Sequence, residues 1–386
     1  MEPEIGLREK PIDIIVFTNA IIHVNPSNTI IGGSLVIKDG KIVDVGKNVK
    51  GYNRSRIIDC TGKHIYPGFI DMMVPVDVDT SLFNLPTKHW NKRVHAQYRP
   101  GVSKKKNKSL HSLGFLYGLL TPESGIFRGY GNLVSLKDTP EILTSRVFET
   151  QHVAMEHGGW DDDDYPNSLL GSIALIRQTF YDSQWYKDSW SIFKEYPELN
   201  VIPEVDDALF AISHEIAEKT PFVFHIKNEN QIERVASLTK EFSLNSWMLG
   251  TGYEYRNLNL FDNFKPFIIL PINLPGKPDV SNKFAELNVD LRELKHWDQA
   301  PYNPTDMINN DIEFSITSYL SSKDEFRNNL NKMIQFGLQS KDALAALTTI
   351  PAKKLQVDHI IGTLDKGKVG NLFITDGDYF DVKSNI

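Results

Sequence analysis

The sequence predicts an α/β protein that consists of a (β/α)8 barrel and a small β-sandwich to which both ends of the chain contribute. Three observations lead to this prediction. The first sixty residues are rich in β-branched side chains, the middle alternates short apolar runs with amphipathic segments, and the end returns to β character. Alternating strands and helices are typical of a parallel sheet. At 386 residues, a closed barrel with an accessory domain is favoured over an open sheet.

The N-terminal β region contains a clear hairpin signal. Asp39-Gly40 lies between two β-branched runs. An Asp-Gly pair suits a two-residue type I′ turn because both central residues need positive φ. Shorter apolar runs on either side indicate further strands, and we assign residues 12–65 to the β-sandwich.

From residue 66 onwards, short strands alternate with helices. The apolar run 222–225 is followed by residues 230–242, where apolar side chains recur at helical spacing. Further pairs of strand and helix follow, and we assign residues 66–360 to the barrel. The last part of the chain, residues 361–386, is rich in turn and strand signals and is assigned to the same β-sandwich as the N-terminus.

Composition narrows the class of protein. The chain has 42 Lys+Arg against 49 Asp+Glu, a net charge of -7, which disfavours nucleic acid or an anionic membrane as partner. No apolar run approaches the ~18 residues that cross a bilayer, and residues 1–10 lack the apolar core of a signal peptide. We expect a soluble protein, exported only if a leader was removed. The single cysteine, Cys60, excludes an intrachain disulfide.

Three segments carry a pattern that is met again in a known family: residues 39–42 running on to 58–71, which end in Pro67-Gly68-Phe69-Ile70-Asp71; residues 224–232; and residues 343–368. Together they resemble the amidohydrolase superfamily, specifically its imidazolonepropionase-like branch, and they cover nearly the whole chain in the right order. The resemblance implies a TIM-like barrel of the metal-dependent hydrolase type. It also implies hydrolysis of carbon–nitrogen bonds other than peptide bonds, in cyclic amides or dipeptide-like compounds.

The resemblance implies metal ligands, and most of them are missing. The two histidines that the family places on the first barrel strand fall at Met73 and Pro75. The sixth-strand histidine aligns with Gly250 and the eighth-strand aspartate with Ser318. Only the fifth-strand histidine is kept, as His225, which is the single retained metal position. Because zinc takes three or four ligands, we expect no cofactor, with zinc as the alternative.

Other polar residues are candidates for the pocket. His152 and Glu156, with His157 beside them, are the best local group of ligating side chains. The first two share a face on a helix or in a strand, but their spacing is one residue too long for a His-x-x-Glu-His motif. We interpret them as polar pocket or surface residues. Arg128 and Arg177 are candidates to bind an anionic group, or else packing arginines.

The segments around these two arginines resemble barrels of tandem amidohydrolase proteins, in which a degenerate barrel precedes an intact one. Two hypotheses follow. The first is a catalytically degenerate barrel, a pseudoenzyme that acts as a scaffold, as the partner of an active barrel or in a homo-oligomer. The second is an active hydrolase with a remodelled site. The missing ligands favour the first, and the early end of the chain after residues 378–380 is expected of a domain from a longer protein.

Overall fold

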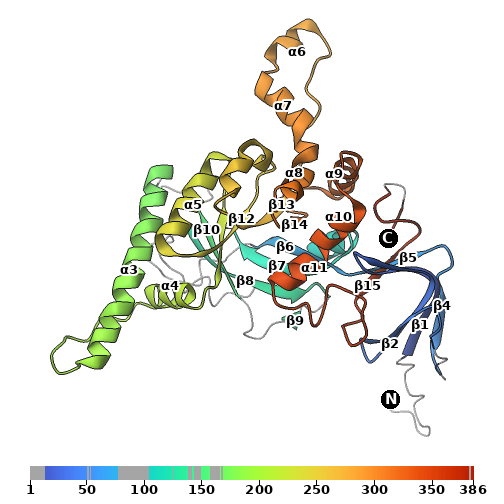
Figure 1. Ribbon diagram of the computed structural model, residues 1–386, viewed down its shortest axis with the longest axis horizontal. Coiled ribbons are helices and arrows are strands. Elements are labelled where there is room, and N and C mark those ends of the chain that lie inside the picture. Colours follow the sequence, from blue (N-terminus) through green and yellow to red (C-terminus); the bar gives the residue numbers. More distant parts are fainter. Residues whose placement is uncertain are drawn as a thin grey trace, which may run out of the picture. The chain divides into compact units, whose positions relative to one another are not determined.

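Figure 1 shows a computed structural model of the chain. The structure describes residues 14–49, 52, 54–76, 104–123, 125–137, 141–142, 149–156, 166, 168–381 and 384–386. They form two compact units. One combines the chain up to Phe69 with Ser340–Ile386, and the other contains Ile70–Gln339.

The first unit contains a six-stranded sheet in the order β15-β5-β1-β2-β3, with β4 paired to β1. Strand β15 pairs antiparallel with β5, so both ends of the chain form one β-rich unit, as predicted. The bounds are β1 (Ile14–Asn25), β2 (Asn28–Lys38), β3 (Lys41–Gly46), β4 (Arg56–Asp59), β5 (His64–Pro67) and β15 (Leu372–Thr375), with helices α10 (Ser340–Leu347) and α11 (Thr349–Lys354).

The predicted hairpin joins β2 to β3 and is confirmed. Asp39 and Gly40 have φ of 52° and 75°, and Lys38 pairs with Lys41 across the turn. Both residues therefore adopt the left-handed conformation that a type I′ turn requires. Buried side chains of β1, β2, β3 and β5, together with Cys60 and Leu364, form an apolar core made of Phe17, Ala20, Ile22, Val24, Leu35, Ile37, Ile42, Cys60, Ile65 and Leu364.

The second unit is a nearly closed barrel sheet in the strand order β14-β13-β12-β11-β10-β8-β7-β6, with β9 paired to β8. Strands β10 to β14 are parallel to one another. The strand bounds are β6 (Phe69–Val76), β7 (Phe115–Pro122), β8 (Phe127–Ser135), β9 (Glu141–Ile142), β10 (Thr150–Ala154), β11 (Pro221–His225), β12 (Asn245–Leu249), β13 (Phe267–Pro271) and β14 (Phe314–Thr317).

One strand differs from an all-parallel barrel. Strand β8 runs antiparallel to both β7 and β10. Only residues 123–126 connect β7 to β8. Such a short connection makes a hairpin, since a parallel crossover needs a dozen residues or more. The predicted barrel is therefore confirmed, with one hairpin built into its sheet.

Helices follow most of the parallel strands. Ser168 caps α3 by accepting a hydrogen bond from the backbone N–H of Gly171. Figure 1 shows α6 and α7 projecting from the rest of this unit. The bounds are α2 (Lys104–His111), α3 (Leu169–Glu195), α4 (Asp207–Ala217), α5 (Asn230–Phe242), η2 (Glu254–Phe261), α6 (Lys283–Asn288), α7 (Leu291–Gln299), η3 (Ala300–Tyr302), α8 (Asn303–Asn309) and α9 (Lys323–Gln335).

The barrel strands are buried on both faces. Every residue of β10, β11, β13 and β14 is buried, which is typical of a parallel sheet covered by helices. Polar side chains within such strands need hydrogen-bond partners inside the barrel. Among the described helices, none combines the length and the apolar character needed to cross a bilayer.

Candidate functional site

A cavity of about 400 Å³ lies where the parallel strands of the barrel end. It is lined by residues at or just after the C-terminal ends of β10, β11, β12, β13 and β14, the edge at which barrels of this kind place their sites. The lining residues are Arg128, Ala154, Glu156, His225, Ile226, Lys227, Leu249, Gly250, Thr251, Tyr253, Pro271, Asn273, Tyr319 and Leu320.

Arg128 reaches this cavity through a β-bulge in β8. His152 of β10 pairs with Gly129, whereas the next residue, Val153, pairs with Phe127. Arg128 is therefore the extra residue of the bulge. Gly129 has a φ of 94°, which favours glycine and lets the strand bend. Because β8 is antiparallel to β10, its first residues lie beside the C-terminal end of β10, where the cavity opens.

Arg128, His225 and His152 form one hydrogen-bonded chain. Arg128 Nη1 lies 3.0 Å from His225 Nδ1, and His225 Nε2 lies 2.9 Å from His152 Nδ1. The chain ends at Thr150, whose Oγ1 lies 2.9 Å from His152 Nε2. An arginine only donates, so His225 accepts at Nδ1 and carries its proton on Nε2. His152 in turn accepts at Nδ1 and donates from Nε2 to Thr150.

Burial and the nearby cation keep both histidines neutral. Burial lowers the pKa of His225 well below its usual value, and Arg128 and His152 lower it further. Burial and then Arg128 lower the pKa of His152 to about 3. Burial also lowers the pKa of Arg128 to about 10, which leaves it protonated at neutral pH. Among these four hydrogen-bonded residues, Arg128 alone therefore carries a charge.

Gly131 leaves space for the hydrogen bond between Thr150 and His152. Gly131 lies opposite Thr150 in the pairing of β8 with β10. A Cβ atom at this position would lie 2.4 Å from Thr150 Oγ1 and 2.7 Å from His152 Nε2. Any side chain at 131 would therefore displace the hydrogen bond between Thr150 and His152.

Asp71 is the buried acidic group of the first barrel strand. Its carboxylate accepts hydrogen bonds from Ser318 Oγ at 2.5 Å and Ser318 N at 3.1 Å. Thr317 Oγ1 at 2.5 Å and Met73 N at 3.0 Å donate to the same group. Burial raises the pKa of Asp71, and these four donors oppose that rise. Ser318, the position at which the resemblance implies an aspartate, thus serves as a donor to Asp71.

Glu254 occupies the space beside Gly250. It is fully buried, and its Oε1 accepts from the backbone N–H groups of Thr251 at 2.6 Å and Gly252 at 3.3 Å. Asn303 Nδ2 donates to Oε2 at 2.7 Å. A Cβ atom at position 250 would lie 2.8 Å from Glu254 Oε1, so a histidine does not fit there. The pattern Thr-x-x-Glu at 251–254, typical of a helix start, is the signal from which the sequence could have identified this residue.

These contacts do not suit the zinc site that the resemblance implies. Both ring nitrogens of His225 are hydrogen-bonded to protein side chains. The buried Met73 offers only a soft thioether, and Gly250 has no side chain to coordinate. Within the described ranges, no group of three or more His, Cys, Asp or Glu residues is placed to hold a metal ion. His157 lies outside those ranges.

The other sequence candidates lie at the rim of the cavity or apart from it. Glu156, just after β10, forms an ion pair with Lys227 at the rim. Arg177 lies on α3, where its Nε is 2.9 Å from Glu241 Oε2 and its side chain is partly exposed. The structure therefore brings Arg128, His152 and His225 together, places Glu156 at the rim, and leaves Arg177 outside the cavity lining.

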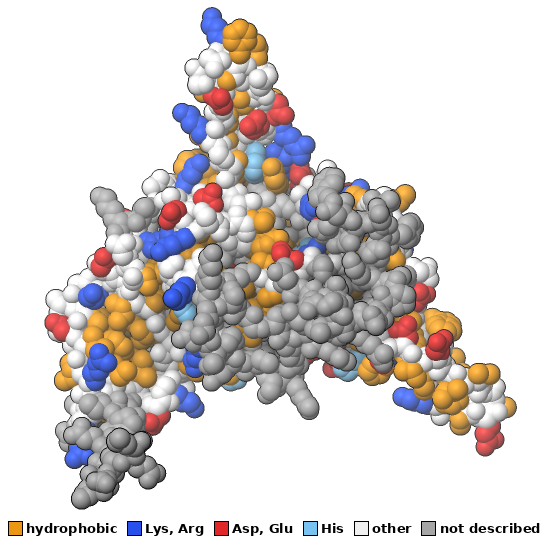
Figure 2. Space-filling view, turned by 180° about the vertical axis from the view of Figure 1, so that it is seen from behind, with side chains coloured by type: hydrophobic (Ala, Val, Ile, Leu, Met, Phe, Trp, Pro, Cys, Tyr) orange, Lys and Arg blue, Asp and Glu red, His pale blue; other side chains and the backbone are white. Residues whose placement is uncertain are grey.

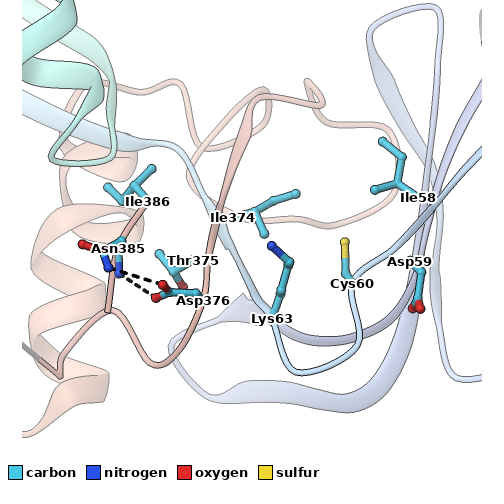
Figure 3. A pocket seen from close by; sticks show the side chains of 9 residues that line it. All are labelled: Ile58, Asp59, Cys60, Lys63, Ile374, Thr375, Asp376, Asn385 and Ile386. Atoms are coloured by element: carbon cyan, nitrogen blue, oxygen red, sulfur yellow. Dashed lines mark hydrogen bonds between the residues drawn. The ribbon is translucent and has the colours of Figure 1, made fainter. Parts of the chain in front are cut away.

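A second cavity of about 400 Å³ lies within the first unit (Figure 3). Cys60 and Lys63 line it, and Asn385 is hydrogen-bonded to Asp376 at its edge. Burial raises the pKa of the Cys60 thiol, which makes it a weak nucleophile at neutral pH. None of the histidines or arginines named as site candidates lines this cavity.

Comparisons with known proteins concern the fold. Neither a family model nor a curated protein matches the sequence. Three similar solved structures are an amidohydrolase from Thermotoga maritima MSB8 (TM-score 0.73, 18% identity, 96% of each chain), a prolidase complexed with N-methylphosphonate-L-proline (0.54, 14%, 95% of this chain and 93% of that one) and a Xaa-Pro dipeptidase with bound methionine (0.55, 14%, 95% and 94%). The chain therefore has the fold of the amidohydrolase superfamily.

Proposed function

We propose that this protein is a catalytically degenerate barrel that acts as a scaffold or as the partner of an active amidohydrolase. The observation that carries the proposal is the engagement of both His225 ring nitrogens by Arg128 and His152. Metal-dependent hydrolysis needs a cation that acidifies a bound water and ligands with free lone pairs to hold it. Here the lone pair of His225 is occupied by a guanidinium that is itself positively charged.

The described residues also lack a well-placed general base. A base must keep a lone pair within reach of the water proton that it removes. The basic nitrogens of His225 and His152 already accept hydrogen bonds, and burial lowers the pKa of both rings. Glu156 at the rim is paired with Lys227. This arrangement favours a binding or supporting role over hydrolysis.

Exposed apolar side chains support the partner role. Phe284 and Leu287 of α6 are 82% and 83% exposed, and Leu291 of α7 is 66% exposed. Figure 2 shows hydrophobic side chains gathered on this projecting segment. Large apolar side chains that are exposed on one short segment are a feature of many contact surfaces. We propose a second amidohydrolase barrel as the partner. Sedimentation of the purified chain tests the other possibility, a homo-oligomer, which a single monomeric species would contradict.

Metal content and hydrolysis together test the proposal. The purified full chain is analysed by mass spectrometry for zinc and assayed against cyclic amides, lactams and dipeptides. We expect no stoichiometric zinc and no hydrolysis. Stoichiometric zinc, or hydrolysis, that is lost in His225→Ala would replace this proposal with the alternative, an active hydrolase of carbon–nitrogen bonds with a remodelled site. The variant Arg177→Met, outside the cavity, is the matched control.

A further inference from the structure

Arg128 is a buried cation without a carboxylate partner among the described residues. It is 6% exposed, and none of the ion pairs of the described part of the chain includes it. Its Nε donates to the Gly125 carbonyl at 3.1 Å, and its Nη1 donates to His225. A guanidinium has five N–H donors, so three remain without an acceptor in the described structure. An unpaired buried charge is costly, which points to a missing anionic partner.

The acidic groups near Arg128 do not supply that partner. Tyr319 and Glu123 both act on Arg128 electrostatically, but Glu123 accepts a hydrogen bond from the Tyr319 hydroxyl. Burial, together with Glu123, raises the pKa of Tyr319 to about 12, so this hydroxyl keeps its proton. The carboxylate of Glu156 is paired with Lys227. Both carboxylates near the cavity are therefore engaged elsewhere.

The rest of the cavity is suited to an apolar group. Ile226, Leu249 and Pro271 line it together with Tyr253 and Leu320. A volume of about 400 Å³ falls within the range of small-molecule sites, which combine apolar walls with a few fixed polar groups. A planar guanidinium with free N–H groups matches the two oxygens of a carboxylate. The cavity thus suits a ligand with one anionic group, which pairs with Arg128, and an apolar body, which packs against the apolar lining.

We infer that this cavity binds a small carboxylic acid with an apolar body, its carboxylate on Arg128 and its body against Leu249 and Pro271. The inference rests on the proposed function, because a metal on His225 would displace the contact with Arg128. Bidentate pairing gives such a ligand both affinity and orientation. The positive charge of Arg128 then recognises a ligand instead of assisting hydrolysis.

Titration calorimetry with benzoate and its neutral isostere benzamide tests the inference on the full chain. We expect benzoate to bind at least about tenfold more tightly than benzamide, because only the carboxylate pairs with the guanidinium. Equal binding of the two probes, or no binding of benzoate, would overturn the inference. This comparison uses the wild-type protein and so does not depend on the folding of any variant.

Two variants locate the site. Arg128→Met should weaken benzoate binding by about tenfold or more, since the charge-assisted pair is lost. Arg177→Met, the same substitution at an exposed arginine outside the cavity lining, should leave binding unchanged. Retained binding in Arg128→Met would contradict the assignment. Metal analysis of the same sample separates the two proposals. Bound zinc would refute the proposed function. Metal-free, inactive protein that does not bind benzoate would refute only this inference.

Discussion

Asp71 and Ser318 are joined by two hydrogen bonds, one from the Ser318 backbone N–H at 3.1 Å and one from its hydroxyl at 2.5 Å. Asp71 lies on β6 and Ser318 directly follows β14, the first and last strands of the barrel order. This pair therefore links the two strands where the sheet is nearly closed. The resemblance implies a metal ligand at position 318. In this structure Ser318 instead hydrogen-bonds Asp71 and so connects two strands of the barrel.

Removing the hydroxyl of this pair should destabilise the protein. Ser318→Ala leaves a fully buried carboxylate with one donor fewer, which costs about 1–3 kcal/mol of unfolding free energy. Urea unfolding measures the change. The matched control is Ser321→Ala, because the buried Ser321 hydroxyl has no partner among the described residues and its loss should cost little. Equal effects of the two variants would contradict the assigned role of Ser318.

A single methyl group should disrupt the histidine chain. Gly131→Ala places a carbon 2.4 Å from Thr150 Oγ1 and 2.7 Å from His152 Nε2. Overpacking of this kind costs about 1–3 kcal/mol. Gly276→Ala is the control, since nothing lies within 4 Å of its Cβ position. Thermal unfolding and the ring ¹⁵N shifts of His152 report the change, and an unperturbed ring would argue against the described packing.

Stability should fall with acid because His152 stays neutral in the folded protein. Its pKa is lowered to about 3, mainly by burial, whereas an unfolded histidine titrates near 6.5. Below pH 6.5 the unfolded chain therefore binds a proton that the folded chain does not. Between pH 7 and pH 5 this difference removes about 2 kcal/mol of unfolding free energy.

Urea unfolding at pH 7, 6 and 5 measures this loss for the wild type and for His152→Asn. The variant should lose about 2 kcal/mol less over the same range, since it lacks this proton uptake. Parallel pH profiles for His152→Asn and the wild type would show that His152 is protonated in the folded protein as well.

Introducing a histidine at position 250 should not create a metal site. The Cβ atom alone would lie 2.8 Å from Glu254 Oε1 and 3.0 Å from Ile268 Cγ2. We expect Gly250→Ala to lose about 1–3 kcal/mol of unfolding free energy from overpacking. Gly250→His should lose at least as much and bind no zinc in a mass-spectrometric assay. Stoichiometric zinc in that variant would show that Glu254 can move aside.

Local signals predicted much of the fold. Asp39-Gly40 specifies its turn through the φ values that two adjacent residues require, and apolar side chains at helical spacing indicated the helix α5 over residues 230–242. The antiparallel direction of β8 is harder to predict from the sequence. It depends on a short connection that the sequence leaves ambiguous, and the bulge at Arg128 exists only in the pairing with β10.

The candidate site, too, could be predicted from the sequence only in part. His225 was identified through the resemblance, which implies a histidine at the end of this apolar strand. Arg128 and His152 were also named as pocket candidates, but their contacts with His225 were not predicted, because they come from strands whose register the sequence alone does not fix. Glu254 was not predicted as a site residue, for a different reason. Its role is to hold backbone N–H groups after Gly250, and an acidic residue near a helix start has many ordinary explanations.

The one-way order of the hydrogen bonds from Arg128 to Thr150 has a consequence for His225. Because the guanidinium cannot accept a proton, it alone dictates which nitrogen of each ring is protonated. Replacing Arg128 would release the Nδ1 lone pair of His225 towards the cavity that both residues line. The His225 imidazole is thus masked by Arg128, and one substitution separates the present arrangement from an exposed imidazole.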